Sequence, residues 1–202
     1  MTDTKQRILD AAERLFASHG FAATSLRSII SAAGVNLAAV HYHFRSKEAL
    51  LEAVILRRAE PVNRERLALL DAGPASLEKV IEAFLAPTVA LARDPERAAF
   101  VRLMGRLHAE STEELARIVH KHFAEVLRRY GEALKRSLPE VPLPELFWRM
   151  HFSIGAMAHA LCAGHQLRII SGGACDGSDS DAMLHRLVDF IAAGFRAPVQ
   201  EK

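Results

Sequence analysis

The side chains with the most chemistry to offer lie together in the short run GVNLAAVHYHF, residues 34–44. His41 and His43 carry ring nitrogens that could hold a metal ion or make hydrogen bonds, and the Tyr42 hydroxyl can also make hydrogen bonds. The same aromatic residues could instead belong to a hydrophobic core. The run is therefore a metal site, a piece of core or a contact surface, and the elements around it decide which.

Apolar residues around this run recur with the period of a helix, at residues 4–19, 26–33 and 37–44. Gly34 supplies the left-handed backbone that a tight turn between two helices needs, and Asn36 can cap the helix that follows. Two short helices joined by such a turn form a helix-turn-helix, whose second helix enters the major groove of DNA. The sequence therefore favours a contact surface.

The residue types on the second of these helices suit contact with DNA. Ala38 and Ala39 are small enough for close approach and could touch a thymine methyl group. Asn36, His41 and Tyr42 can make hydrogen bonds to bases or phosphates. The predicted DNA contacts are Thr24, Ser25, Arg27, Asn36, Leu37, Ala38, Ala39, His41, Tyr42, His43 and Lys47.

Several residues near this surface have a second interpretation. His43 is a phosphate contact or a structural hydrogen-bonding group rather than a base reader, and Arg45 is a phosphate contact or simply an exposed charge. Thr24 or Ser25 should cap the helix that follows them. Phe44 is expected in the core, between the helix of residues 37–44 and the helix that follows it.

Helical spacing continues through the rest of the chain, and alternating β-branched runs are absent. Pro61 is expected to interrupt one helix and begin another, because a first turn needs no N–H there. STEE at residues 111–114 has the form of a capping box, and SGGACDGSDSD at residues 171–181 predicts a flexible loop. The helices expected after residue 46 cover residues 47–60, 62–71, 76–92, 95–108, 112–137, 144–170 and 180–196. The predicted fold is all-α, with an N-terminal three-helix helix-turn-helix domain and a C-terminal helical bundle.

Composition and charge fit a soluble, cytoplasmic protein. The chain is 50 % hydrophobic and 25 % charged, with a net charge of +2, so the whole chain is not a polycation. Residues 1–47 nevertheless hold six basic groups against three acidic ones, which hints at a polyanionic partner for that segment. The two cysteines have no CxxC spacing, and the most apolar stretch, residues 152–163, is too short to span a bilayer. We expect no membrane partner.

Ten histidines raise the possibility of an enzyme or a metal sensor. The motifs HExxH, GxSxG, GxGxxG and the P-loop are all missing from the chain. His120 and His122 are two residues apart on an expected helix, so they point to different sides and make a poor metal pair. We expect no catalytic residues, no metal and no cofactor.

The first 55 or so residues resemble the DNA-binding region of TetR-family transcriptional regulators. The resemblance lies in ILDAAERLFASHGF, in the helix with the pattern I..AAGV, and in YHFRSKEALL. It implies a homodimer that reads a pseudo-palindromic operator and, by the family's habit, represses. Many members carry tyrosine at the place of His41, whereas here the tyrosine stands one place later, at Tyr42, so either residue could be the phosphate contact.

The resemblance assigns residues 1–47 to DNA binding, a linking helix to residues 47–60, and effector binding and dimerisation to residues 48–202. The body of such regulators dimerises through its last two long helices. Here LPELFWRMHFSIGAMAHALCAGHQL is apolar around most of its circumference, so it must be covered on more than one side. With MLHRLVDFIAAGF at residues 183–195, it predicts a four-helix interface across a two-fold axis.

The body and the reading helix also resemble regulators that answer long-chain fatty acids or their derivatives, through FVRLMGRLHAES, FAEVLRRYGEAL and VPLPELFWRMHFSIGA. A lipid sensor needs a long apolar slot with one polar end, at which Arg102, Arg149 or His108 could meet a carboxylate. Each apolar candidate could equally be ordinary core, Arg149 could pair with Glu145, and a regulator without an effector is the alternative. The predicted ligand contacts are Phe84, Phe100, Met104, Leu107, His108, Phe123, Leu127, Tyr130, Trp148, Arg149 and Phe152.

Overall fold

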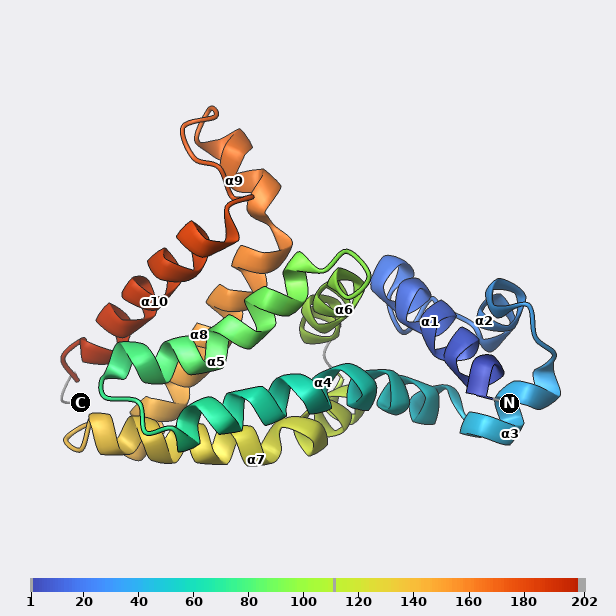
Figure 1. Cartoon of the computed structure of the whole chain (residues 1–202), viewed down its shortest axis with the longest axis horizontal. Helices are drawn as coiled ribbons and strands as arrows, with labels where there is room; N and C mark the ends of the chain where they lie inside the picture. Colours follow the sequence, from blue (N-terminus) through green and yellow to red (C-terminus); the bar gives the residue numbers. More distant parts are fainter. Residues whose placement is uncertain (1, 111, 200–202) are drawn as a thin grey trace. The chain divides into compact units, whose positions relative to one another are not determined.

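The computed structural model describes residues 2–110 and 112–199, with side chains from Thr4 onward. Within those residues the chain forms ten α-helices and no β-strand, which confirms the predicted all-α fold (Figure 1). The helices are α1 (Thr2–His19), α2 (Leu26–Ala33), α3 (Leu37–Phe44), α4 (Lys47–Asp71), α5 (Leu77–Arg93), α6 (Ala98–Ala109), α7 (Glu113–Ser137), α8 (Leu143–Cys162), α9 (Gly164–Ile170) and α10 (Ser180–Arg196).

Local hydrogen bonds set the ends of α2 and α3, as the sequence predicted. The Ser25 hydroxyl accepts the backbone N–H of Ser28, and the Ser28 hydroxyl accepts the N–H of Ser25, which forms a capping box. Gly34 ends α2 with a φ of 61°, the left-handed conformation that glycine adopts without strain. The Asn36 side chain accepts the N–H of Ala39 at 2.9 Å and begins α3.

Two predicted helix boundaries are wrong. Pro61 lies inside α4, which continues through the position where a break was expected, so residues 62–71 are not a separate helix. The predicted helix of residues 144–170 is divided into α8 and α9, which begins at Gly164. A Cβ on Gly164 would lie 3.1 Å from the Gly177 carbonyl oxygen, so two backbone segments meet where the helix stops.

Local hydrogen bonds hold parts of the loop of residues 171–181, which the sequence predicted to be flexible. Its backbone N–H at Cys175 donates to the Ser171 hydroxyl at 3.0 Å, and the Asp179 carboxylate caps α10. The predicted capping box at residues 111–114 depends on Ser111, which lies outside the described residues. Within the described part, the Thr112 hydroxyl accepts the N–H of Leu115 at 3.3 Å.

The chain divides into two compact units. The first comprises residues 1–61 and 95–123, and the second comprises residues 62–94 and 124–202. The core of the first unit includes Ile8, Phe16, Ile29, Val40, Phe44, Leu50 and Leu51. This core joins α1, α2 and α3 to the beginning of α4.

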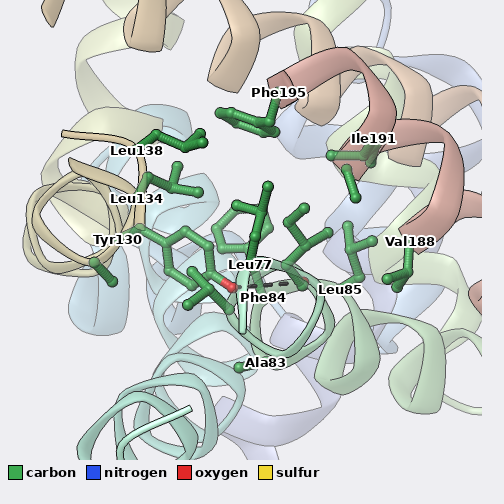
Figure 2. Packing of buried hydrophobic residues seen from close by; sticks show 14 of the residues in the cluster. Leu77, Ala83, Phe84, Leu85, Tyr130, Leu134, Leu138, Val188, Ile191 and Phe195 are labelled. Carbon is green, nitrogen blue, oxygen red and sulfur yellow. Dashed lines mark hydrogen bonds between the residues drawn. The ribbon is translucent and has the colours of Figure 1, made fainter. Parts of the chain in front are cut away.

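The core of the second unit joins α5, α7, α8 and α10. Figure 2 shows Phe84 and Tyr130 facing each other across this core, with ring centroids 4.6 Å apart. The Tyr130 hydroxyl donates a hydrogen bond to the Ile81 carbonyl at 3.4 Å. Burial raises the pKa of that phenol well above its usual range, because the charged form is disfavoured away from water.

None of the described helices is both long enough and apolar enough to cross a membrane.

Candidate nucleic-acid interface and regulatory body

The outer face of α3 is an exposed surface of small and polar side chains. Ala38 and His41 are exposed, and Leu37 and Tyr42 have exposed fractions of 52 % and 74 %. Val40 and Phe44, on the opposite face, are buried. The inward side chains hold the helix in place, so the outward ones are left available to a partner.

The other predicted contact residues of this turn and helix are either engaged in a hydrogen bond within the protein or half-buried. Asn36 is exposed, but its side-chain oxygen already caps α3. Ala39 and His43 are half-buried. The His43 ring centroid lies 5.0 Å from that of Tyr42 and 6.0 Å from that of Phe44, so this side chain has aromatic neighbours.

The flanking positions present two exposed groups and one tethered cation. Ser25 and Arg27, at the start of α2, are exposed. The Lys47 ammonium lies 4.3 Å from the centre of the Phe21 ring and donates to the Ala22 carbonyl at 3.4 Å. Lys47 therefore connects the first turn of α4 to the loop before α2.

Thr24 is a correction to the predicted surface. Its exposed fraction is 3 %, and its hydroxyl donates to the Gly20 carbonyl at 2.7 Å and the Leu15 carbonyl at 3.2 Å. The side chain thus points into the first unit and not toward a partner. It stabilises the loop between α1 and α2.

Sequence reasoning missed a support from α1 to the turn. The Arg7 guanidinium donates to the carbonyls of Ala33 and Gly34 at 2.6 and 2.9 Å, where α2 ends and leaves carbonyls without helical partners. A Cβ on Gly34 would lie 2.8 Å from this guanidinium. Only the general preference for cations at helix C-termini could have signalled this contact, and nothing in the sequence joins residues 7 and 33.

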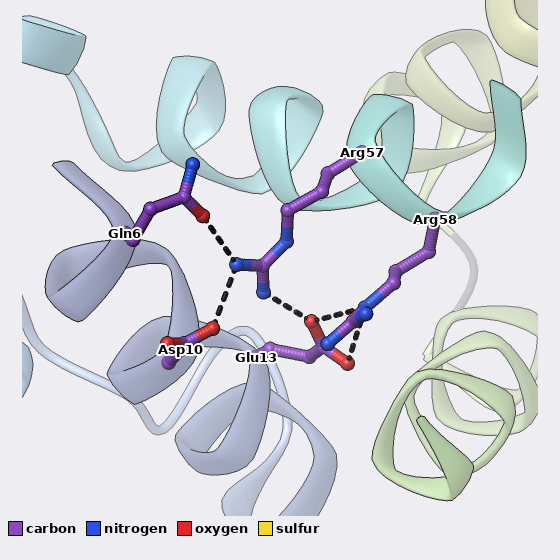
Figure 3. Close-up of polar contacts among 5 residues, drawn as sticks. All are labelled: Gln6, Asp10, Glu13, Arg57 and Arg58. Atoms are coloured by element: carbon purple, nitrogen blue, oxygen red, sulfur yellow. Dashed lines mark hydrogen bonds and ion pairs between the residues drawn. The ribbon is translucent and has the colours of Figure 1, made fainter. Parts of the chain in front are cut away.

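A second missed feature is an ion-pair network between α1 and α4 (Figure 3). The buried carboxylate of Glu13 accepts from Arg57 Nη2 at 2.5 Å and from Arg58 Nε at 3.0 Å. Arg57 Nη1 also donates to Asp10 at 2.7 Å and to Gln6 at 3.2 Å. We call residues 1–47 the reading head. The network fixes its first helix, α1, on α4.

In the second unit, the structure leaves almost no space for a ligand in the core. Phe84, Leu127 and Tyr130, all predicted to line a slot, surround a cavity of about 20 Å³. A cavity of that size holds about one water molecule. These three side chains therefore enclose too little space for an alkyl chain in this structure.

The predicted ligand contacts between residues 100 and 123 belong to the first unit. Phe100 and Leu107 are buried in its core, Met104 and Phe123 are half-buried, and His108 is exposed. Arg102, the other candidate for a carboxylate, is also exposed.

Arg149, predicted to meet an effector carboxylate, is instead a buried structural group. Its exposed fraction is 6 %. Its guanidinium donates to the carbonyls of Phe195 and Ala197 at 2.6 and 2.9 Å, and to the Glu145 carboxylate at 2.8 Å. Arg149 therefore binds the carbonyls at the end of α10. It also forms the ion pair with Glu145 that the sequence offered as the alternative.

Trp148 and Phe152 do not line the core cavity either. Their exposed fractions are 58 % and 62 %, and their ring centroids are 5.6 Å apart on the outer face of α8. On α10, Phe190 is 70 % exposed. A groove lined by Phe152, Ala156, Phe190, Ala193 and Gly194 lies between these two helices, so their outer surface is apolar and uncovered.

A further hollow of about 440 Å³ lies near the ends of α8 and α10. It is lined by side chains of α8, α9, α10 and the loop between α9 and α10, among them His159, Leu167, Cys175 and Arg186. In the described part of the chain, no group of three or more histidine, cysteine, aspartate or glutamate side chains is placed to hold a metal ion.

Comparison with known families decides what this arrangement belongs to. Residues 8–54 match the family of bacterial regulatory proteins of the tetR type, and residues 82–194, more than half of the chain, match the tetracyclin repressor-like C-terminal domain. The chain belongs to the TetR family. The family consists of DNA-binding transcriptional regulators, so this protein is a regulator and not an enzyme.

Individual relatives match this TetR-family regulator over part of its length. It is 49 % identical over 51 residues to the regulator YerO of Bacillus subtilis, a match that covers 25 % of this chain and 18 % of YerO. It is 31 % identical over 103 residues to SrpR of Pseudomonas putida, which covers 50 % of this chain and 46 % of SrpR. The regulator thus spans less than half the length of either curated relative.

Solved structures extend the likeness to the whole fold. The fatty acid degradation regulator FadR from Bacillus halodurans superposes on this TetR-family regulator with a TM-score of 0.68. The match covers 96 % of this chain and 97 % of that one, at 16 % identity. At that identity the likeness concerns the fold.

Proposed function

We propose that this regulator binds a pseudo-palindromic double-stranded DNA operator as a homodimer and represses transcription until a small hydrophobic effector releases it. The observation that carries the proposal is the outer face of α3, where Leu37, Ala38, His41 and Tyr42 are exposed within a helix-turn-helix. Such a face suits a major groove, where the first residues of the second helix meet base edges.

The exposure of each side chain supports a division of labour. Leu37 and Ala38, in the first turn of α3, contact bases, and His41 and Tyr42 contact bases or phosphates further along the groove. Arg27 and Ser25 anchor phosphates beside it, as does Lys47 if it leaves its contact with Phe21. Phosphate contacts position the head and base contacts give specificity.

In the proposed division of the chain, residues 1–47 bind DNA, the helix of residues 47–60 links them to the body, and residues 48–202 bind the effector and dimerise. The uncovered apolar face of α8 and α10 supports the dimer. Trp148, Phe152 and Phe190 gather there, and large exposed aromatic surfaces are rare on monomers. A two-fold axis through this face would pair two α8 and two α10 helices and give a dimer with two reading heads.

The effector we propose is a long-chain fatty acid or an acyl derivative. The sequence resemblance of the body supports this class, and FadR of Bacillus halodurans, which has the same fold, is a fatty acid degradation regulator. The cavity beside Phe84, Leu127 and Tyr130 must open to accept an alkyl chain, because about 20 Å³ admits none. An effector that binds the opened body and not the closed one shifts the equilibrium between these two forms. The size of the shift is set by the difference between its affinities for the two forms.

The closed cavity favours a second candidate, a regulator that binds DNA without a small-molecule effector. In that case the packed core of the second unit would be a finished structure and not a closed pocket. The two candidates share the same reading head and differ only in what the body binds.

Native mass spectrometry of the purified protein tests the effector and the dimer together. A dimer that carries a fatty acid or acyl thioester, confirmed by denaturing extraction, supports the lipid sensor, and the extracted compound should release DNA. A ligand-free dimer that ignores added oleate in a DNA-release assay supports the second candidate. A protein that is monomeric both with and without added oleate refutes the proposed dimer interface.

Selection of duplexes from a random pool tests DNA binding. The purified protein should enrich an inverted repeat with its half-site centres about one helical turn, roughly 34 Å, or a multiple of it apart. Failure to enrich any sequence would contradict the proposed reading of bases by α3.

A further inference from the structure

The loop between α1 and α2 is held from several sides within the first unit. Gly20 has a φ of 86°, in the left-handed region that favours glycine. The Thr24 hydroxyl donates to the Gly20 carbonyl, and the Phe21 ring lies 5.4 Å from that of Phe16. Because Ser25 begins α2 directly after this loop, the position of the loop sets where the helix-turn-helix begins.

A further contact to this loop comes from Glu110, which is 89 positions away from Phe21 in the sequence. Glu110, at the C-terminal end of α6, accepts the backbone N–H of Phe21 on its Oε2 at 3.0 Å. α6 packs against α1 in the first unit (Figure 1). The carboxylate lies so close to the loop that a Cβ on Gly20 would be 2.0 Å from Glu110 Oε1. The left-handed glycine and the carboxylate therefore fit each other.

The location of this carboxylate needs a compensating contact. The C-terminus of a helix carries a partial negative charge, so a glutamate there is unfavourable unless a donor offsets it. The Phe21 N–H is such a donor, since hydrogen bonds to charged acceptors are stronger than those between neutral groups. Loss of this contact would leave an amide of the loop without its acceptor in a half-buried place.

We propose that Glu110 is a positioning residue for DNA binding, which acts by fixing the loop of residues 20–24 and hence the start of α2. It does not touch DNA. Its effect passes through the loop to the exposed groups of α2, Ser25 and Arg27, and through Gly34 to α3. The proposal rests on the proposed DNA-binding function of the reading head.

The test uses the full-length protein and a duplex enriched from a random pool by the wild type. Glu110→Met keeps the length of the side chain and removes the acceptor, whereas Glu110→Gln keeps an oxygen acceptor. Glu110→Asp keeps the charge but withdraws it by one methylene. Glu114→Met, at an exposed position in α7, is the matched control. Affinity is measured for the selected duplex and for a scrambled one, and hydrogen exchange is followed at the Phe21 amide.

Glu110→Met and Glu110→Asp should each bind the selected duplex about tenfold more weakly, which corresponds to one charged hydrogen bond. Glu110→Gln should stay within about threefold of the wild type, and the control should be unchanged. The ratio of the affinity for the selected duplex to that for the scrambled one should fall most for Glu110→Met and Glu110→Asp and least for Glu110→Gln. Hydrogen exchange at the Phe21 amide should accelerate in the variants that lose this preference. A residue that only stabilised the fold would lower both affinities equally by reducing the folded fraction.

Wild-type affinity and preference in a folded Glu110→Met protein would overturn the proposal. If Glu110→Met does not fold, the same result for Glu110→Asp would overturn it. An equal loss on both duplexes would also overturn it. If the wild type enriches no duplex, the proposed function fails instead, which is a separate result.

Discussion

Replacement of Glu13 by alanine should destabilise the protein more than any substitution of an exposed carboxylate. Glu13 has an exposed fraction of 2 % and is the acceptor for two arginines of α4 (Figure 3). Without it, Arg57 keeps Asp10 and Gln6 as partners, but Arg58 Nε loses the carboxylate to which it donates. The substitution therefore leaves positive charge at a site that is shielded from water.

The expected loss follows from this geometry. Removal of one partner from a buried ion pair typically costs about 3–5 kcal/mol. The two arginine side chains retain 18 % and 21 % of their exposure, so water offsets part of the penalty and the lower end applies. We expect about 3 kcal/mol, which is a change of roughly 150-fold in the unfolding equilibrium. Glu13→Gln keeps one oxygen acceptor and should lose about half as much.

Urea unfolding followed by circular dichroism measures this loss. The protomer concentration must be the same for every variant, because dimerisation would couple stability to concentration. Glu65→Ala, at an exposed position further along α4, is the control and should change the free energy of unfolding by no more than about 0.5 kcal/mol. If Glu13→Ala matches this control at an unchanged urea dependence, the network contributes no net stability and the reasoning is refuted.

Four further substitutions test the other sites. Tyr42→Ala should weaken operator binding about tenfold without changing the melting temperature, measured by fluorescence anisotropy and calorimetry; unaltered affinity would remove this residue from the interface. Phe152→Glu should give a monomer in analytical ultracentrifugation, because it places a charge in the proposed apolar interface; a persistent dimer would place the interface elsewhere. Arg149→Met should cost about 2–3 kcal/mol of stability, since it leaves the carbonyls at the end of α10 without donors; a change in effector response at unchanged stability would restore Arg149 as a ligand contact. The hydrogen bond from Lys121 holds the pKa of Glu52 below its ordinary value of 4.5, so this carboxylate stabilises the fold above that pH and loses its effect as pH falls through the lowered pKa. The stability difference between Glu52→Gln and wild type should accordingly be present at about pH 7 and shrink as the pH falls below 4.5, and a difference independent of pH would contradict the role of this ion pair.

The reading head was predictable because its signals are local. The capping box at Ser25, the left-handed turn at Gly34 and the cap at Asn36 each depend on groups within four residues of one another. Short-range hydrogen bonds and backbone preferences therefore revealed the helix-turn-helix before any packing was known. The prediction failed at Pro61, where the same local preference that permits a helix to begin was overridden and α4 continued.

The ligand contacts were much less predictable, and the reason is geometric. Helical spacing shows which side chains share a face, but it does not show what covers that face. Tyr130 and Trp148 are both aromatic residues at helical spacing, yet the first is buried in the core and the second is exposed on the outer face of α8.

The all-α fold, the helix-turn-helix and the family were predictable from the sequence, because periodicity, caps and short motifs each depend on residues that are close together in the chain. The tertiary structure alone decided that Arg149 serves the end of α10, that the body core is closed, and that Glu110 reaches the backbone of Phe21. These facts depend on pairs of groups far apart in the sequence. Such pairs are brought together by the packing of whole helices, which no local pattern records.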